Sequence, residues 1–329
     1  MKLGVVLFQL GGPDSLESVE PFLYNLFSDP DIIDFPFARI ARQPLARLIA
    51  ARRAAHVAHH YAELGGRSPL IDNTFRQAAA LEARLCEMLD ARVVVAMRYW
   101  HPFTAEAIAQ LEQLRPAELV LLPLYPQYSS TTTGSSLREW TRRFHPTDWH
   151  PRVHVVEEFH QDEAYLSAVA QAIDRTLASF ERADDVDFVF SAHSLPVAVV
   201  ERGDPYQRQI ERTVDLVWRR GAWRGRRHIC YQSKVGASKW LRPSMHETIR
   251  RLAVEGRRQV LVAPISFVSD HVETLHEIDI EHRRQARALG IERFAMVPGL
   301  NDSPRFIEAL AGLVGRCVSA SLAQPCGSA

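Results

Sequence analysis

The stretch Phe188–Tyr206 reads FVFSAHSLPVAVVERGDPY and decides the fold. Its apolar start, Val186–Phe190, predicts a buried strand, and SAHSLP (191–196) follows directly at the strand's carboxyl end. Pro196 lacks a backbone N–H and blocks continuation of the strand. Because ligands of open α/β sheets bind at the carboxyl ends of the strands, this order predicts that His193 lies in a ligand site. The stretch alone leaves open the alternative that His193 merely caps the strand.

Strand and helix patterns alternate along the 329 residues. The expected strands are Leu3–Leu10, Arg92–Met97, Glu118–Leu124, Val153–Phe159, Val186–Phe190, His228–Gln232, Gln259–Ser266 and Arg293–Val297. The helices expected between them are Phe35–Tyr61, Asn73–Leu89, Thr104–Leu114, Asp162–Phe180, Pro205–Arg219, Pro243–Glu255, Asp270–Leu289 and Ser303–Ser319. This alternation favours βαβ units with parallel sheets, and the length suggests two domains that divide near His150–Phe159.

The composition narrows the class of protein. Lys and Arg total 39 and Asp and Glu total 39, so no bulk charge attracts nucleic acid. Four widely spaced cysteines (86, 230, 317 and 326) do not indicate a disulfide framework. The amino terminus enters a strand without a signal sequence, and no apolar run reaches the ~20 residues that span a bilayer. We expect a cytoplasmic protein.

Two other segments have open interpretations. The break Gly11–Ser15 follows a strand, but it lacks the G-x-G-x-x-G pattern and Pro13 removes an amide, so nucleotide binding is not expected. The helix Phe35–Tyr61 alternates apolar and arginine residues, which is typical either of a membrane-surface helix or of a solvated helix packed on a core. Arg52 and Arg53 in it are suited to binding carboxylates.

Three glutamates form a row near the carboxyl end. Glu273, Glu277 and Glu281 are spaced i, i+4, i+8 and lie on one side of a helix, although like charges at this spacing cost about 0.2–0.5 kcal/mol per pair. Asp270 and His271 precede the row. Oxygen ligands with an imidazole suit a divalent transition metal, so the row is a candidate path for such an ion.

Two structural interpretations compete with the metal path. Asp270 and Glu273 have the spacing of a capping box. The later acidic residues could face water and pair with Arg283 and Arg284.

Several of these stretches together resemble the ferrochelatase family. The matching stretches stand in the family's order and run from about Leu3 to about Leu310: LGGPDSLESVEPFLYNLFSDPDII, RYWHPFT, YPQYSSTTTGSS, SAHSLP with ERGDPY, YQSKVGASKWLRP and ISFVSDHVETLHEIDIE.

The resemblance implies a lyase that inserts Fe(II) into protoporphyrin IX, with release of two protons, in the last step of haem biosynthesis. It also implies an α/β fold of two Rossmann-like domains, each a parallel four-stranded sheet flanked by helices, with a porphyrin cleft between them. The first expected domain comprises residues 1–155 together with a C-terminal helix within 303–329 that returns to it. The second comprises residues 156–302 and carries His193 and Glu273.

The resemblance assigns catalytic roles to His193 and Glu273. Two pyrrole protons must leave, and an imidazole that titrates near neutrality is a suitable base. We therefore expect His193 to abstract protons and the glutamate row to deliver metal or carry protons away; the reverse division stays open. The expected metal-contacting residues are His193, Glu273, Glu277, Glu281, Asp270 and His271.

The resemblance also implies porphyrin contacts. Ser233 and Arg53 match propionate-binding positions, although His56 stands where animal enzymes carry a second cation, and Leu10 matches a residue on the macrocycle face. The expected set is Leu10, Arg53, Arg98, Tyr99, Tyr128, Ser130, Ser233 and Trp240. The family favours peripheral contact of Phe35–Ile49 with the inner face of the membrane and hand-off of porphyrin from protoporphyrinogen oxidase.

A [2Fe–2S] cluster is not expected, because such clusters need four thiolates and the four cysteines here are not clustered. Iron is thus expected as a substrate and not as a permanent cofactor. Two other functions are open: a coproporphyrin III ferrochelatase and a non-catalytic porphyrin or haem carrier. A carrier would be expected to lack His193 or the glutamate row.

Overall fold

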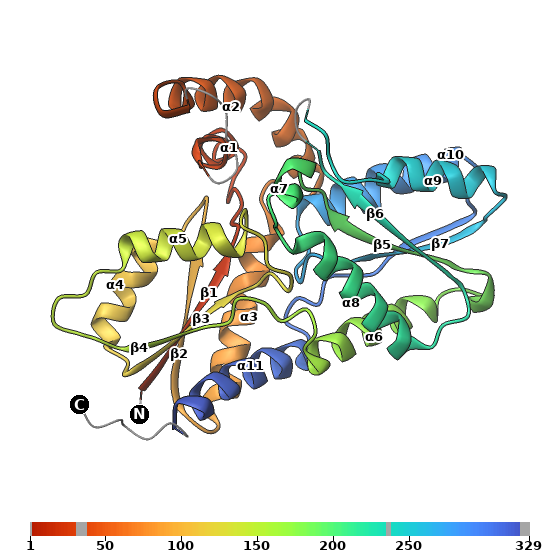
Figure 1. The fold of residues 1–329 in the computed structure, drawn as a ribbon. Helices are drawn as coiled ribbons and strands as arrows, with labels where there is room; N and C mark the ends of the chain where they lie inside the picture. The colour runs from red at the N-terminus through yellow and green to blue at the C-terminus, as the bar shows by residue number, and fades with distance from the viewer. Residues whose placement is uncertain (1, 31–37, 235–237, 323–329) are drawn as a thin grey trace. The chain divides into compact units, whose positions relative to one another are not determined.

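The computed structural model describes residues 2–30, 38–234 and 238–322. The chain forms two compact units (Figure 1). The N-terminal unit comprises Met1–Tyr125, Ser130–Phe159 and Asp302–Ala329, and the C-terminal unit comprises Pro126–Ser129 and His160–Asn301.

The N-terminal unit is built on a parallel sheet in the order β2-β1-β3-β4. Strands β1, β2 and β3 contain long apolar runs, as expected for parallel strands that are covered on both faces, whereas the edge strand β4 leaves Val153 and Val155 exposed. Their bounds are β1 Lys2–Gln9, β2 Asp90–Met97, β3 Glu118–Pro123 and β4 Arg152–Val155, so the last strand is shorter than its sequence pattern predicts.

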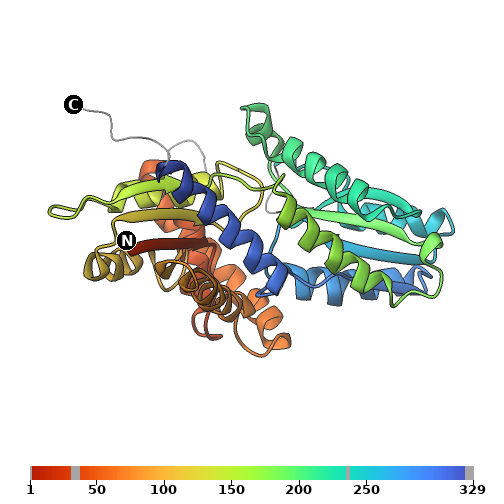
Figure 2. The same cartoon turned by 90° about the horizontal axis from the view of Figure 1, so that it is seen from below.

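Helices cover both faces of this sheet. On one face, α4 and α5 close a core in which the Phe8 and Trp140 rings meet edge to face at 5.8 Å. On the other face lie α3 and α11, and Figure 2 shows α11 running beside the strands. A further pair, α1 and α2, pack on each other. The bounds are α1 Val19–Ser28, α2 Ala38–Glu63, α3 Pro69–Cys86, α4 Thr104–Leu114, α5 Thr133–Arg143 and α11 Pro304–Leu322.

The C-terminal unit repeats the architecture with the sheet order β6-β5-β7-β8, again parallel. The strands are β5 Asp187–His193, β6 Arg226–Gln232, β7 Gln259–Pro264 and β8 Arg293–Met296. Strand β5 continues three residues beyond its apolar run, because Ser191 and His193 still pair with β6, at Cys230 and Gln232. His193 is therefore the last residue of a central strand.

In this unit, α6 and α8 lie on one face of the sheet and α9 and α10 on the other (Figure 1). The helix expected over Asp270–Leu289 begins at Glu273; it is a π-helix, η2, to His282 and continues as α10. The remaining bounds are α6 Glu163–Leu177, η1 Ala183–Asp185, α7 Val197–Glu201, α8 Tyr206–Gly221, α9 Met245–Val254, η2 Glu273–His282 and α10 Arg283–Ala288.

The segment Phe35–Ile49, expected to contact a membrane, falls partly outside the described residues. Within them, Leu48 has 47% of its surface exposed. No helix in the described part of the chain is long and apolar enough to cross a bilayer. Peripheral membrane contact stays a prediction.

A buried carboxylate joins three elements at the amino end of β5. Asp187 is fully buried; one of its oxygens lies 2.8 Å from His228 Nε2 and the other accepts a hydrogen bond from Arg257. Burial alone would raise the pKa of Asp187, but the bonds and charges of these two partners lower the pKa below its ordinary value. The charge of Asp187 therefore stabilises the folded C-terminal unit.

We predict that Asp187→Asn destabilises the protein by on the order of 3 kcal/mol at pH 7, because Arg257 loses its counter-charge and His228 loses its contact with a carboxylate. The Asp187 pKa is lowered on folding, so the advantage of the wild type exists above pH 3.8 and disappears as the pH falls through the lower folded value. Urea denaturation at several pH values measures this difference.

Asp215→Asn is the matched control, since Asp215 pairs with Arg227 in an exposed position. This change should cost less than about 1 kcal/mol. An equal loss of stability in the two variants would contradict the role given to Asp187.

Candidate active site

The backbone of His193 is fixed on both sides. Its N–H donates to Ser266 Oγ at 2.9 Å, and its carbonyl accepts from the Tyr206 hydroxyl at 3.0 Å. Ser266 follows β7 and Tyr206 begins α8, so two neighbouring elements hold the end of β5. The imidazole is thereby held at the carboxyl end of the C-terminal sheet, as the sequence predicts.

An ion pair joins His193 to the start of η2. His193 Nδ1 lies 2.8 Å from Glu273 Oε2, with 35% and 22% of the two side chains exposed. Gln232 holds the backbone here, donating from Nε2 to the Glu273 carbonyl at 3.1 Å while its Oε1 accepts from Ser191 at 2.6 Å. Since Nδ1 faces the carboxylate, the Nε2 atom of His193 is the one available to a substrate.

The pair shifts both pKa values. Burial alone would lower the pKa of His193, but the charge and hydrogen bond of Glu273, with a smaller effect from Glu277, raise it above 6.5. Burial alone would raise the pKa of Glu273, and the imidazolium lowers it well below its usual range. Each partner of the pair therefore favours the ionised form of the other.

The pKa of Glu277, the second acid of the row, is shifted in the opposite direction from that of Glu273. Burial and the Glu273 charge raise its pKa to about 7, although the Ser233 hydroxyl donates to Glu277 Oε2 at 2.6 Å. Ser233 has a φ of 58°, in the left-handed region that non-glycine residues rarely adopt, and this backbone places its hydroxyl at the carboxyl group. Glu277 can thus exchange a proton at physiological pH.

His271 lies beside the ion pair. Its Nδ1 is 3.2 Å from the Ser269 carbonyl, and its buried Nε2 is 3.8 Å from Glu273 Oε2. The Phe267 ring contacts His271 at 4.1 Å and His193 at 6.0 Å between centroids. Two imidazoles and one carboxylate are therefore gathered in the C-terminal unit, a ligand set that suits a divalent transition metal.

Asp270 takes part in a hydrogen-bond network, and its expected contact with the metal stays a prediction. It accepts hydrogen bonds from the Gly299 N–H at 2.9 Å and from Asn301 Nδ2 at 2.8 Å, so it ties the segment before η2 to the loop after β8. The capping-box interpretation is wrong, because the Glu273 carboxylate is paired with His193 instead of the backbone of Asp270.

Glu281 lies at the exposed end of the row. Its side chain is 49% exposed, and its Oε1 is 3.9 Å from His276 Nδ1. Arg283, which was expected to neutralise the later acids, pairs with Asp279. The three glutamates thus run from the His193 pair, through a carboxyl that titrates near pH 7, to an exposed carboxylate.

Three of the predicted porphyrin contacts lie in the C-terminal unit. Ser233 is described above. The backbone N–H of Tyr128 donates to Gln209 at 2.7 Å, and Trp240 forms an isolated bridge with Pro196. The buried Nε1 of Trp240 has no hydrogen-bond partner among the described residues, so this indole can still donate to a ligand.

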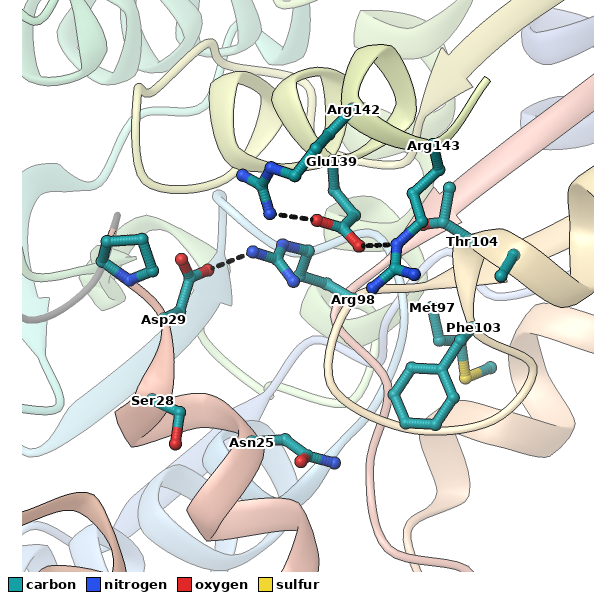
Figure 3. A pocket seen from close by; sticks show the side chains of 12 residues that line it. Asn25, Ser28, Asp29, Met97, Arg98, Phe103, Thr104, Glu139, Arg142 and Arg143 are labelled. Carbon is teal, nitrogen blue, oxygen red and sulfur yellow. Dashed lines mark hydrogen bonds and ion pairs between the residues drawn. The ribbon is translucent and has the colours of Figure 1, made fainter. Parts of the chain in front are cut away.

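In the N-terminal unit, Arg98 and Tyr99 belong to a buried network, of which Figure 3 shows the pair of Arg98 and Asp29. Arg98 pairs with Asp29 at 2.9 Å, and the Tyr99 hydroxyl donates to the same carboxylate at 2.6 Å. Ser135 bridges Arg98 and Asp29 at 2.9 and 3.0 Å. Tyr99 is only 1% exposed and its hydroxyl holds Asp29, a residue that was not predicted from the sequence.

The other predicted residues of this unit have separate surroundings. The Arg53 guanidinium lies over the Phe27 ring at 5.7 Å, the Ser130 carbonyl accepts from Arg138 at 2.6 Å, and Leu10 is half-buried after β1. Their porphyrin contacts stay predictions.

Figure 3 also shows a pocket of about 390 Å³ beside the Asp29 network. Two exposed arginines at its rim, Arg142 and Arg143, pair with Glu139 at 2.5 and 2.7 Å.

Three of the four cysteines fall within the described residues. Cys230 is buried in β6, Cys86 ends α3 and Cys317 lies in α11. Cys326 lies outside the described residues, so the expected absence of a cluster stays a prediction.

The architecture is that of the chelatase class. The structure is similar to that of the sirohydrochlorin chelatase SirB from Bacillus subtilis subspecies spizizenii in complex with cobalt, with a TM-score of 0.52 over 98% of each chain. Sequence identity is 11%, so this likeness concerns the fold alone.

Sequence comparison resolves the family within this class. The ferrochelatase family model matches residues 2–317. A ferrochelatase of Aquifex aeolicus is 48% identical over 95% of this chain and 99% of its own length. A ferrochelatase of Geotalea daltonii is 45% identical over 95% and 97%. The chain belongs to the ferrochelatase family.

We predict that Glu273→Gln lowers the pKa of His193, because the charge that raises this pKa is lost while burial remains. NMR titration of the imidazole measures the shift. Glu281→Gln is the control, since that exposed carboxylate is not among the groups that shift His193. Equal shifts in both variants, or none in Glu273→Gln, would rule out the ion pair as the cause.

A second prediction concerns the buried network around Asp29. Tyr99→Phe removes a donor from a buried carboxylate and should destabilise the protein by about 1–3 kcal/mol. Thermal unfolding of this variant is compared with that of Tyr24→Phe, in which a less buried tyrosine of the same unit is changed. A smaller loss in Tyr99→Phe than in the control would contradict this role.

Proposed function

We propose that this chain inserts Fe(II) into protoporphyrin IX and releases two protons. The observation that carries the proposal is the arrangement in the C-terminal unit: His193 is paired to Glu273 at 2.8 Å, and Glu277, whose pKa is raised to about 7, follows in the same row. Metal insertion needs acceptors for two pyrrole protons, and this row supplies a base and a proton relay.

His193 is the proposed first acceptor. Only the neutral imidazole can take a pyrrole proton, and Glu273 then stabilises the imidazolium that forms. Because the carboxylate raises the pKa of His193, the insertion rate should increase as the pH rises through that pKa. Glu273 thus favours proton uptake and holds the ring in position.

Glu277 is the proposed route by which protons leave. Deprotonated Glu277 accepts a proton, and the exposed Glu281 passes it to water. The balance is complete: one Fe(II) enters, two N–H bonds break and two protons leave, with no change of oxidation state. The same carboxylates, before they are protonated, can also bind the cation as it moves inward past Glu281.

The porphyrin contacts are proposed unit by unit. Tyr128, Ser233 and Trp240 are the candidates in the C-terminal unit, and the free indole N–H supports Trp240. Leu10, Arg53, Arg98 and Ser130 are the candidates in the N-terminal unit. Tyr99 is left out because its ring is buried. A porphyrin that is held bent exposes its nitrogen lone pairs to the incoming metal. A site that binds the bent form therefore stabilises the transition state more than the flat substrate.

The cellular location and the source of the porphyrin are also proposed. We infer a cytoplasmic protein whose segment Phe35–Ile49 contacts the inner face of the membrane and receives porphyrin from protoporphyrinogen oxidase. The support is the chemistry of the substrate, since a poorly soluble macrocycle is best transferred at a lipid surface. No resident cofactor is proposed, and iron is a substrate.

The decisive experiment is anaerobic Fe(II) insertion followed by absorbance, with protoporphyrin IX and coproporphyrin III in parallel. We expect faster turnover of protoporphyrin, and a loss of about 10²–10⁴-fold in His193→Ala. His246→Ala, which changes an exposed histidine of the same unit, should match the wild type.

Faster turnover of coproporphyrin III would identify the protein as a coproporphyrin III ferrochelatase. Tight porphyrin binding without insertion would instead identify a carrier. Near-normal turnover in a folded His193→Ala variant would exclude His193 as the base.

A further inference from the structure

The proposed reaction assigns no role to the pocket of about 390 Å³ in the N-terminal unit. This pocket lies where α1 and β2 end and α4 begins, and the second half of α5 completes its wall (Figure 3). Small-molecule sites have volumes of about 300–1,000 Å³. The pocket is therefore large enough for a small organic molecule.

Two arginines at the rim of the pocket share one carboxylate. Arg142 Nη1 lies 2.5 Å from Glu139 Oε2, and Arg143 Nε lies 2.7 Å from Glu139 Oε1. Both arginine side chains are 55% exposed, whereas that of Glu139 is 9% exposed. Each guanidinium carries a positive charge and five N–H donors, so one carboxylate leaves spare donors and one positive charge on this side of the pocket. The two arginines can therefore bind a further anion.

The other carboxylate of the pocket, Asp29, already has a counter-charge. Arg98 pairs with it at 2.9 Å, and the hydroxyls of Tyr99 and Ser135 donate to it at 2.6 and 3.0 Å. Among the described residues, three arginines and two carboxylates line the pocket, so its net charge is +1. This charge is complementary to a ligand with one negative charge.

The first turn of α4 adds backbone donors. Phe103, Thr104 and Ala105 line the pocket where this helix begins. Glu106 accepts from the Phe103 N–H at 2.7 Å and lies 2.8 Å from His101 Nδ1, so its carboxylate serves the residue before the helix. The helix itself supplies no acceptor for the N–H groups of Thr104 and Ala105, and the positive end of its dipole favours anions.

The α1 side of the pocket carries a buried hydroxyl without a partner. Ser28 ends α1, and its Oγ has no hydrogen-bond partner among the described residues. Buried hydroxyls are nearly always hydrogen-bonded, so this one indicates a partner that the chain does not supply. Met97 and Phe103 give the same pocket an apolar surface.

We propose that this pocket binds a small organic carboxylate with one negative charge. The planar carboxylate matches the guanidinium groups of Arg142 and Arg143, and the apolar body of the ligand suits Met97 and Phe103. Inorganic phosphate has no apolar body and fits this lining less well. Binding requires neither His193 nor metal insertion.

The test is an NMR titration of the full chain with benzoate, an aromatic monocarboxylate, at constant ionic strength. The backbone N–H signals of Thr104 and Ala105 and the Nε–H signals of Arg142 and Arg143 should shift together and saturate with one Kd. Arg142→Gln and Arg143→Gln should each weaken binding by about tenfold or more, because each removes a charge-assisted hydrogen bond. Benzyl alcohol, which lacks the carboxylate, should bind at least about tenfold more weakly than benzoate.

Arg115→Gln is the matched control, because the Arg115 side chain is 56% exposed and pairs with Asp148 outside the pocket. It removes the same charge from the same unit and should change the affinity less than about twofold at an ionic strength of about 0.15 M. The amide spectrum of each variant shows that its fold is intact.

Equal weakening in Arg115→Gln, unchanged binding in both pocket variants, or equal binding of benzyl alcohol would overturn the proposal. Tighter binding of inorganic phosphate than of benzoate would do the same. Displacement of benzoate by protoporphyrin IX would also overturn it, because the pocket would then belong to the porphyrin site. None of these readouts depends on iron insertion, so this proposal and the proposed function fail independently.

Discussion

The ion pair between His193 and Glu273 is the contact on which the rest of the candidate site depends. It joins the end of a central parallel strand to the first turn of a π-helix, two segments that are 80 residues apart in the sequence. Each partner favours the ionised form of the other, which offsets the effect of their partial burial. The negative charge of Glu273 also raises the pKa of Glu277. This contact therefore shifts the pKa of Glu273 and, together with burial, that of Glu277.

The surrounding fold fixes the geometry of this pair. Ser266 and Tyr206 hold the backbone of His193, and Gln232 holds that of Glu273. Asp270 anchors the segment before η2 through Gly299 and Asn301. π-Helical turns are rare and occur frequently at functional sites, and this one carries all three glutamates. The C-terminal unit thus combines a rigid strand end with an unusual helix.

The strand patterns and the position of His193 were predictable from the sequence, because apolar runs and strand-ending prolines are local signals. The spacing of Glu273, Glu277 and Glu281 likewise placed them on one helix. The π-helical hydrogen-bond pattern was not predictable, since apolar periodicity does not distinguish it from an α-helix. The roles of Asp29 and Asp270 depend on partners about 30 to 100 residues away, which spacing cannot reveal.

Proton release through Glu277 is tested most directly by the pH dependence of single-turnover metal insertion in the wild type and in Glu277→Gln. The wild-type profile should contain an ionisation near pH 7, and the variant should lack it while retaining the one that belongs to His193. Ser233→Ala should move the same ionisation upward, because the hydroxyl that lowers the Glu277 pKa is gone. An identical pH profile in wild type and Glu277→Gln would contradict the account.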